Sequence, residues 1–418
     1  MRATFVAIAA ALVMQACAPT PIVNVSPSPA AVANPSEAAP IFDPATPRPS
    51  PPPTATPFVP CIAPAKIVAD ISMANICITS ANVFVEASIG GQDLHDLYDQ
   101  IAMDLSVVQS EFAWTLRGRP EIYVFAAPGS YRTGLIHVFG YSGPTAAFVA
   151  ENSVAFFEPD LRVILVNWDA IRDRRPISAI RHELTHFVTL EACEPRCELV
   201  PAWLNEGQAR LAEASMRGGE WRLVRVRYEA ASMVKTDTLM PLSRLVTQSQ
   251  WNNITSWAGY YKYQEAARAT ELLREDIGGA QPMARLYDRL RRGEDVARAY
   301  ASLTGRQFDS FASGLAARFQ DGIPSGPAIV MTAGPQAGHG VGYLLYGFGP
   351  EEKVTLRIVG RRTEETEEIS VSPQGAHFSE IVDRYPSGLY VIAVTKGDNV
   401  VASTRFEKRG GRPPYRLD

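Results

Sequence analysis

The sequence lacks the excess of basic residues that binding to nucleic acid usually requires. Its 418 residues include 40 Lys and Arg against 44 Asp and Glu, which gives a net charge of −4 at pH 7. Proteins that recognise a polyanion normally carry a clustered basic surface, so we expect no nucleic-acid partner. Hydrophobic residues make up 46% of the chain, and this ordinary globular composition is long enough for two or three domains.

Cysteine is scarce as well, with five residues in the whole chain. Cys17 lies near the amino terminus, and the other four are Cys61, Cys77, Cys193 and Cys197. An even number of cysteines in an exported protein typically forms disulfides, and closeness in sequence favours pairing 61 with 77 and 193 with 197. The last two could instead form half of a metal site. No second pair with matching spacing is present, so we favour a disulfide in a loop.

The first residues have the pattern of a secretory signal. Met1-Arg2 is followed by an apolar run over residues 3–14, which is shorter than the about 20 residues that a membrane-spanning helix needs. Residues 14–17, Met-Gln-Ala-Cys, resemble a bacterial lipobox, although Leu and a small residue are usual at the first two positions. We therefore expect residues 1–17 to direct export and Cys17 to be lipidated, which anchors the protein at the cell surface. The alternative is cleavage near Ala16 and free secretion.

Residues 18–60 are rich in proline and poor in apolar side chains. They contain 14 of the 32 prolines of the chain. Such a segment cannot bury a core and samples extended, polyproline-like conformations. We expect a disordered linker that holds the following domain away from the membrane surface.

Two patterns divide the remaining chain up to residue 322. Alternating and apolar runs predict strands at residues 82–86, 121–125, 153–157 and 162–166, with an amphipathic helix at 93–112. Helical spacing then predicts helices at 177–189, 202–216, 261–277, 282–290, 296–303 and 308–319. The fold class expected for residues 61–322 is therefore α+β, with a small mixed sheet followed by a helical half.

The pattern changes again over residues 328–418. Short apolar runs at 343–346, 354–359, 367–371 and 389–394 are separated by Gly, Pro and Asn. This spacing is typical of a small β-sandwich, and the segment resembles the Ig-like modules that are appended to secreted enzymes. The fold of such a module does not disclose a ligand.

The chemistry is concentrated in the pentad His182-Glu183-Leu184-Thr185-His186. On a helix, residues i and i+4 share one face, so both imidazoles can reach one metal ion and the Glu183 carboxylate lies beside them. This is a His-Glu-x-x-His zinc signature. The flanking apolar residues would bury this face, where unpaired His and Glu would be costly. The alternative is two core histidines whose partners are backbone carbonyls.

The other four histidines occur singly, and we expect them to be surface residues or satisfied core residues. They are His95, His137, His339 and His377.

A catalytic zinc ion needs a third protein ligand and an open position for water. No histidine follows His186 within 150 residues, which excludes a three-histidine site. The next predicted helix contains Trp203-Leu-Asn-Glu-Gly-Gln-Ala-Arg-Leu-Ala-Glu213, and nineteen residues separate His186 from Glu206.

The pentad together with this segment resembles the gluzincin metallopeptidases. The segment is similar to that around the third zinc ligand in the aminopeptidase branch and in the peptidase MA-like proteins, and the spacing is that of thermolysin-like enzymes. The resemblance implies a zincin-type catalytic domain with one zinc ion, bound by His182, His186 and Glu206. It also implies that Glu183 is the general base, with Glu213 and Asn205 adjacent to the ligands.

A second segment, Tyr263-Gln-Glu-Ala-Ala-Arg-Ala-Thr-Glu-Leu-Leu, resembles the helix whose first tyrosine stabilises the transition state in that branch. Tyr260 and Tyr261 stand close enough to compete for this role, and we rank Tyr263 first and Tyr261 second. The alternative for each is a ring that only packs at the start of a helix. One departure from the family is the absence of the Gly-Ala-Met-Glu-Asn strand that holds a free amino terminus. Residues 152–158 occupy its place, so endo- or exopeptidase specificity stays open.

The sequence thus predicts zinc-dependent hydrolysis of peptide bonds at the cell surface by a monomeric protein, with a peptide or protein as substrate. A second hypothesis is an inactive, surface-anchored binding or scaffold protein that uses its C-terminal β-sandwich. The intact set of predicted ligands and base favours the enzyme.

Overall fold

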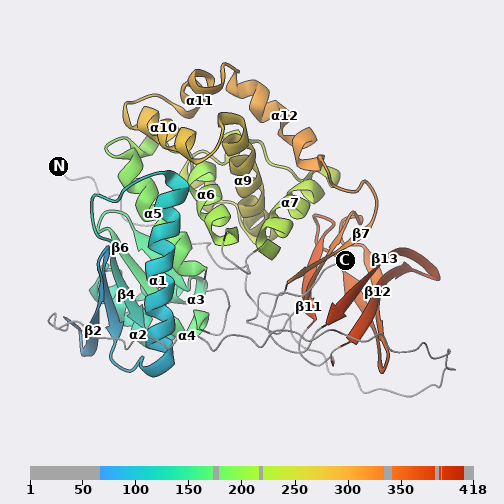
Figure 1. The fold of residues 1–418 in the computed structure, drawn as a ribbon, viewed down its shortest axis with the longest axis horizontal. Coiled ribbons are helices and arrows are strands. Elements are labelled where there is room, and N and C mark those ends of the chain that lie inside the picture. Colours follow the sequence, from blue (N-terminus) through green and yellow to red (C-terminus); the bar gives the residue numbers. More distant parts are fainter. Residues whose placement is uncertain are drawn as a thin grey trace, which may run out of the picture.

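The computed structural model describes residues 66–172, 178–215, 220–333, 341–381, 386 and 388–408. A sheet with covering helices lies at one end, a group of helices lies in the middle, and antiparallel sheets lie at the other end (Figure 1). Within these ranges no helix is both long and apolar enough to cross a bilayer. The predicted signal, the linker, Cys17, Cys61 and His339 all fall outside the described residues.

The first part is built on a six-stranded sheet with strand order β1-β2-β3-β4-β6-β5. The strands are β1 (Lys66–Val68), β2 (Ile71–Ile78), β3 (Ala81–Glu86), β4 (Glu121–Phe125), β5 (Ala155–Glu158) and β6 (Val163–Asn167). The central strands β3, β4 and β6 are parallel, whereas β5 is an edge strand antiparallel to β6. The four strands predicted in this region are confirmed, and β1 and β2 were not predicted.

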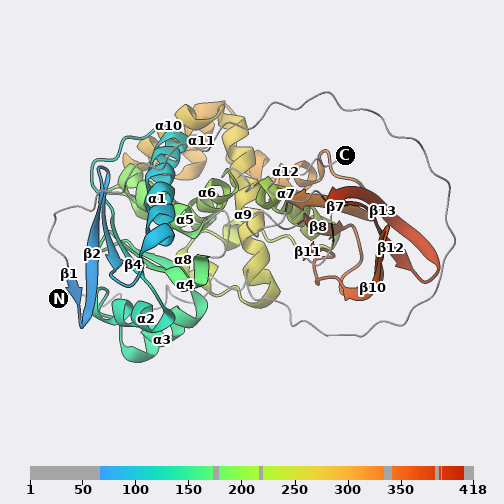
Figure 2. The same cartoon turned by 60° about the horizontal axis from the view of Figure 1, so that its bottom comes forward.

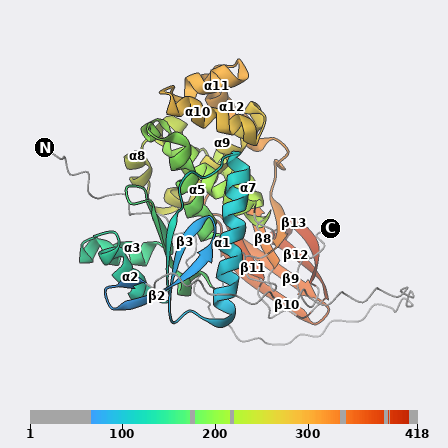
Figure 3. The same ribbon diagram turned by 60° about the vertical axis from the view of Figure 1, so that its left-hand side comes forward.

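Both faces of the sheet are covered because successive side chains of a strand point to opposite faces. Ile122 and Val124 of β4 pack with α1 (Gly91–Phe112) and α5 (Ala179–Cys193), whereas Tyr123 and Phe125 pack with α2 (Pro128–His137) and α3 (Gly143–Asn152). Figure 3 shows the sheet between these two layers. All five residues of β6 are buried, as expected for a strand covered on both sides.

The helical part continues with longer helices around α5, and a short helix, α4 (Trp168–Ile171), precedes it. They are α6 (Ala202–Ala214), α7 (Glu220–Lys235), α8 (Gln248–Asn252), α9 (Ser256–Ile277), α10 (Ala280–Arg291), α11 (Val296–Thr304) and α12 (Phe308–Gln320). All six helices predicted here are confirmed, although α9 begins five residues earlier than expected. Helix α7 was not predicted, because its several arginines weaken its apolar pattern.

Helices α6 and α9 approach each other closely at Gly207. A Cβ atom at this position would lie 2.4 Å from the backbone oxygen of Ala266 and 2.3 Å from the Thr270 hydroxyl. Only glycine allows this approach, which places the first half of α6 directly against α9.

The C-terminal part contains two antiparallel sheets, with strand orders β10-β9-β12-β13 and β11-β8-β7. The strands are β7 (Ala328–Ala333), β8 (Val341–Tyr346), β9 (Lys353–Gly360), β10 (Thr363–Ser370), β11 (His377–Ile381), β12 (Gly388–Lys396) and β13 (Asn399–Lys408). Apolar residues of both sheets, such as Leu345 and Ile392, share one core. Strands β7, β11 and β13 were not predicted. Strand β10 begins four residues earlier than expected, because its charged first residues do not form an apolar run. These charges lie on an edge strand, where they prevent pairing with other chains.

The predicted disulfide between Cys193 and Cys197 is present just after α5. Cys77 on β2 also takes part in a disulfide. Because its predicted partner, Cys61, lies outside the described residues, that pairing stays a prediction.

A buried ion pair joins α1 to α5 one residue before the pentad. The Arg181 guanidinium donates to Asp104 at 2.7 Å, and both side chains are at most 2% exposed. Arg181 also donates to the Ser215 hydroxyl at 3.2 Å, next to the end of α6. This one side chain therefore holds α1, α5 and the end of α6 together.

We predict that Asp104→Ala lowers the free energy of unfolding by about 3–5 kcal/mol, because it leaves a guanidinium buried without its counter-charge. Burial raises the pKa of Asp104 to about 6 despite the attraction of Arg181, so the measurement is denaturant unfolding at pH 8, where the carboxyl is ionised. The control is Asp99→Ala on the same helix, at a side chain that is 65% exposed; its effect should stay within about 0.5 kcal/mol. Equal effects of the two variants would contradict the prediction.

Candidate metal site

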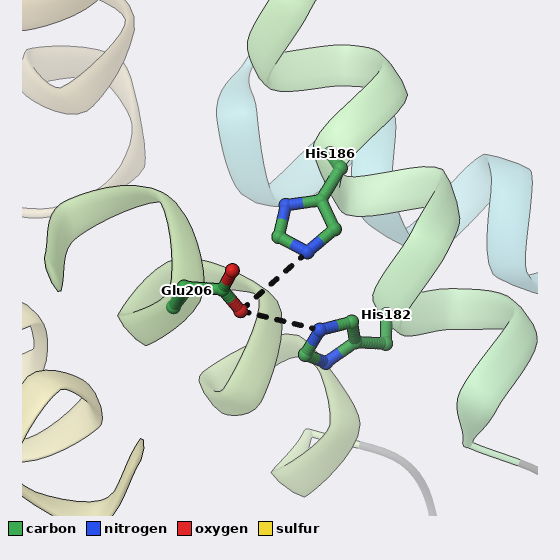
Figure 4. Close-up of side chains that lie close together, drawn as sticks. All are labelled: His182, His186 and Glu206. Carbon is green, nitrogen blue, oxygen red and sulfur yellow. Dashed lines mark ion pairs between the residues drawn. The ribbon is translucent and has the colours of Figure 1, made fainter. Parts of the chain in front are cut away.

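Helices α5 and α6 bring His182, His186 and Glu206 together. The two histidines lie one turn apart on α5, and Glu206 lies in the first half of α6. The Nε2 atoms of His182 and His186 are 3.6 and 3.7 Å from the same Glu206 oxygen, Oε2 (Figure 4). One ligand atom from each residue lies within 4.8 Å of the others, so this largely buried group could hold a metal ion.

The opposite nitrogen of each imidazole is held by an oxygen. The Nδ1 atom of His182 lies 2.6 Å from the Glu213 carboxylate, and that of His186 lies 3.0 Å from the Asn205 side-chain oxygen. Because these oxygens accept hydrogen bonds, each Nδ1 carries a proton and each Nε2 faces Glu206. This arrangement is typical of metal-binding histidines, whose second nitrogen donates to a carboxylate or carbonyl.

The atoms that face one another lack ordinary partners. His182 Nε2 and Glu206 Oε2 are buried and have no hydrogen bond among the described residues, and their separation of 3.6 Å is too long for one. Buried polar atoms are nearly always hydrogen bonded, so a pair of orphaned atoms aimed at one point requires an explanation. A metal ion bound between them would supply the missing partner.

The electrostatics of the group favour a positive charge. Burial alone would lower the pKa of His182, but the carboxylates of Glu206 and Glu213 outweigh it and raise the pKa to about 10. Burial alone would raise the pKa of Glu206, but the two imidazoles hold it below its usual value. The carboxylates around His182 thus favour a cation at this point.

Glu183 lies beside the two histidines on α5 and is 5% exposed. Burial raises its pKa, although the imidazoles of His182 and His186 oppose the shift. Its carboxylate also accepts a hydrogen bond from the backbone amide of Phe157. This bond places the edge strand β5 next to Glu183.

The structure distinguishes between the candidate tyrosines. The Tyr263 hydroxyl accepts a hydrogen bond of 3.5 Å from the Trp251 indole. Burial, followed by the negative charge of Glu206, raises the pKa of Tyr263 well above its usual value, so the hydroxyl stays protonated beside the candidate ligands. The Tyr261 hydroxyl is instead 2.8 Å from the Ser372 hydroxyl in the C-terminal part, and the Tyr260 hydroxyl donates to Glu229. These contacts do not fit Tyr261 or Tyr260 as the residue that acts at the metal.

Sequence reasoning missed two groups of charged residues around the site. The buried Lys262 donates to the backbone oxygens of Trp251 and Ile254, at 2.6 and 3.1 Å. Burial lowers its pKa to about 8, whereas the nearby Glu206 carboxylate favours its charged form. The sequence does contain a signal for Lys262, since this lysine directly precedes the candidate tyrosine in a helix with a buried face.

Two arginines bind the carboxylate behind His182. Arg210 donates to Glu213 at 2.6 Å, and the Nε atom of Arg222 is 3.6 Å from the same oxygen. Together with the imidazole they hold the pKa of Glu213 down at about 2, against the effect of burial. Arg222 was missed because it lies on α7, which the sequence pattern did not predict.

The described histidines outside the pentad do not join the site. His95 lies 3.8 Å from the Asp99 carboxylate on α1, and His137 is exposed at the end of α2. His377 lies on β11, where burial lowers its pKa to about 4. His339 lies outside the described residues.

Comparison with known proteins does not assign a family to this chain. No protein-family model matches the sequence, and no curated protein matches it significantly. The function must therefore be argued from the site, because a fold by itself does not imply a function.

Proposed function

We propose that this protein is a zinc metallopeptidase of the gluzincin kind. The observation that carries the proposal is the convergence of two imidazole Nε2 atoms and one carboxylate oxygen, with an oxygen behind each imidazole. Two histidines and one glutamate are a ligand set typical of catalytic zinc, which leaves a fourth position open. The mixed sheet with an antiparallel edge strand beside α5 supports a zincin-type domain. The shared core of the two C-terminal sheets supports an Ig-like sandwich.

In this proposal the residues of the chain have separate roles. A zinc ion at the three donors supplies Lewis acidity, which activates water and polarises a carbonyl group. Glu183 accepts a proton from the attacking water and then delivers it to the leaving amine; the raised pKa of this buried carboxyl suits such a base. The Tyr263 hydroxyl donates to the oxygen on which negative charge develops.

The edge strand β5 suggests how a substrate lies. It ends at Glu158 and adjoins Glu183 through the Phe157 amide. Among the described strands it pairs only with β6. An extended peptide can add to such an edge by main-chain hydrogen bonds, which favours a peptide or protein substrate bound through its backbone. The lipid anchor on Cys17 and the proline-rich linker would present this site at the cell surface.

The test is metal analysis of the purified protein together with cleavage of an unbiased peptide library. We expect about one zinc ion per chain and cleavage that a chelator abolishes and added zinc restores. The cleavage positions would distinguish endo- from exopeptidase activity. Zinc bound without any cleavage would favour the inactive binding protein, and a protein that binds no zinc would contradict both the metal site and the enzyme.

We predict that Tyr263→Phe lowers kcat about 10²-fold, the size of effect seen when one donor to an oxyanion is removed. KM and zinc content should change little, because the ring and its packing against Trp251 remain. A matched control is Tyr300→Phe, which removes a hydroxyl that donates to Asp276. Steady-state kinetics check the prediction, and equal activity of the two variants would remove Tyr263 from the mechanism.

A further inference from the structure

Helix α7 lies between α9 and the C-terminal sheets, as Figures 1 and 2 show from two directions. Near its start, α7 carries Arg222, whose guanidinium lies close to Glu213, the carboxylate behind His182. The ring of Trp221, the residue before Arg222, stacks on Phe378 of β11, with ring centroids 5.5 Å apart. The guanidinium of Arg222 lies over the same Trp221 ring, 4.4 Å from its centroid.

These contacts form an unbroken path to the proposed metal site. Arg222 is 3.6 Å from the Glu213 carboxylate, and Glu213 is 2.6 Å from the Nδ1 atom of His182. The path therefore runs from Phe378 through Trp221 and Arg222 to Glu213 and one of the two histidines.

A second set of contacts fixes the start of α9. Tyr261 precedes Tyr263 by two residues on α9. Its hydroxyl is 2.8 Å from the Ser372 hydroxyl of the C-terminal part. Arg225 of α7 lies over the Phe378 ring at 4.2 Å and also donates to the Tyr260 hydroxyl. The C-terminal part thus contacts α7, which carries Arg222, and α9, which carries Tyr263.

The contact between α7 and the C-terminal sheets is close. The Lys235 amine donates to the backbone oxygen of Gly347 at 2.7 Å, and the Ser232 hydroxyl donates to that of Gln374. Gly375 has φ +72, and a Cβ atom there would lie 2.4 Å from a backbone oxygen and 3.0 Å from a Thr236 methyl carbon. Such packing distinguishes the C-terminal part from a module on a flexible tether, which makes few contacts with its neighbour.

We propose that the C-terminal sheets are a positioning element of the metal site, and that Phe378, Trp221 and Arg222 transmit this effect to Glu213 and His182. The inference rests on the proposed function, because it concerns the same metal site. It assigns the C-terminal part a role in metal binding, whereas the sequence predicted a role for it, in recognition, only under the alternative hypothesis of an inactive binding protein.

The test compares zinc affinity in three variants of the protein, measured by competition with a chromogenic chelator and without substrate. Arg222→Gln removes the charge that holds Glu213, and we expect zinc affinity to fall about 10-fold, the lower end for loss of an outer-shell partner. Phe378→Leu acts one contact further away, and we expect a loss of about 3- to 10-fold. The matched control is Phe406→Leu, which breaks another stacked pair of the C-terminal part, with Tyr390, and should keep wild-type affinity.

Two results would overturn the inference. One is wild-type affinity in Phe378→Leu; the other is an equal loss in Phe378→Leu and Phe406→Leu, which would reflect general loosening of the sheets. Thermal unfolding of each variant confirms that the folded protein is being compared. If the wild type binds zinc but cleaves no peptide, the proposed function is wrong, while the comparison of zinc affinities still tests the inference. If the wild type has no affinity for zinc, both the proposed function and the inference are wrong.

Discussion

Replacing Glu183 with glutamine is expected to abolish nearly all peptide hydrolysis while zinc stays bound. Glutamine keeps the size of the side chain and its ability to accept from the Phe157 amide, but it cannot take a proton from water. Loss of a general base typically costs about 10²- to 10⁴-fold in rate. Measurement of kcat and of zinc content in the same preparation checks both parts of the expectation.

The matched control for this variant is Glu191→Gln. Glu191 is also buried on α5, but its carboxylate accepts from the backbone amides of Arg117 and Gly118, at 2.8 and 2.6 Å. We expect this variant to lose stability and to keep the turnover number of the wild type in its folded fraction. Normal activity of Glu183→Gln would contradict the assignment of the base.

Replacing Glu206 with alanine is expected to remove the metal itself. In the proposed site the carboxylate is both a ligand and the negative charge between two imidazoles, and alanine supplies neither. We expect zinc affinity to fall by more than about 100-fold, which is the largest loss typical of removing a residue that only hydrogen-bonds to a ligand. Hydrolysis should disappear with the metal. Chelator competition and metal analysis after dialysis are the measurements.

Glu198→Ala serves as the control for Glu206→Ala, since its side chain is 60% exposed and pairs only weakly with Arg196. It should bind zinc as the wild type does. Wild-type affinity in Glu206→Ala would show that the third ligand is another residue and would remove the basis of the gluzincin comparison.

The two variants separate the roles that the proposed mechanism assigns. Glu183→Gln should lose chemistry with the metal in place, whereas Glu206→Ala should lose chemistry because the metal is absent. If both variants lost the metal, Glu183 would be a ligand and not a base.

Much of the site could be predicted because it depends on local spacing. The interval between His182 and His186 places both on one face of any helix, whatever the rest of the fold. The apolar residues around them predict the helix, and the segment containing Glu206 predicts the next one. Asn205 directly precedes Glu206 and Glu213 follows it by two turns on α6; the resemblance implied that both are adjacent to the ligands.

The parts that could not be predicted depend on contacts between segments far apart in the chain. The sequence ranked Tyr263 before Tyr261 on a resemblance alone, and only the packing of α9 between α6 and the C-terminal sheets shows that their hydroxyls have different neighbours. Helix α7 has a weak apolar pattern because its arginines pair with glutamates of α7 itself or of α9, or lie over aromatic rings. A pattern search reads such arginines as surface residues.

The sequence by itself therefore determined the helices of the site, its two candidate histidine ligands and the glutamate beside them, because periodicity and short spacing carry that information. Glu206 as the third candidate ligand came from the resemblance to a known family. Tertiary structure alone decided which atoms face one another, which tyrosine lies beside the ligands and how the C-terminal sheets meet α7. The physical reason is that burial and hydrogen bonding of a polar side chain are set by its neighbours in space. For Glu213 and Arg222 those neighbours lie on different helices, and for Tyr261 and Ser372 they lie more than a hundred residues apart.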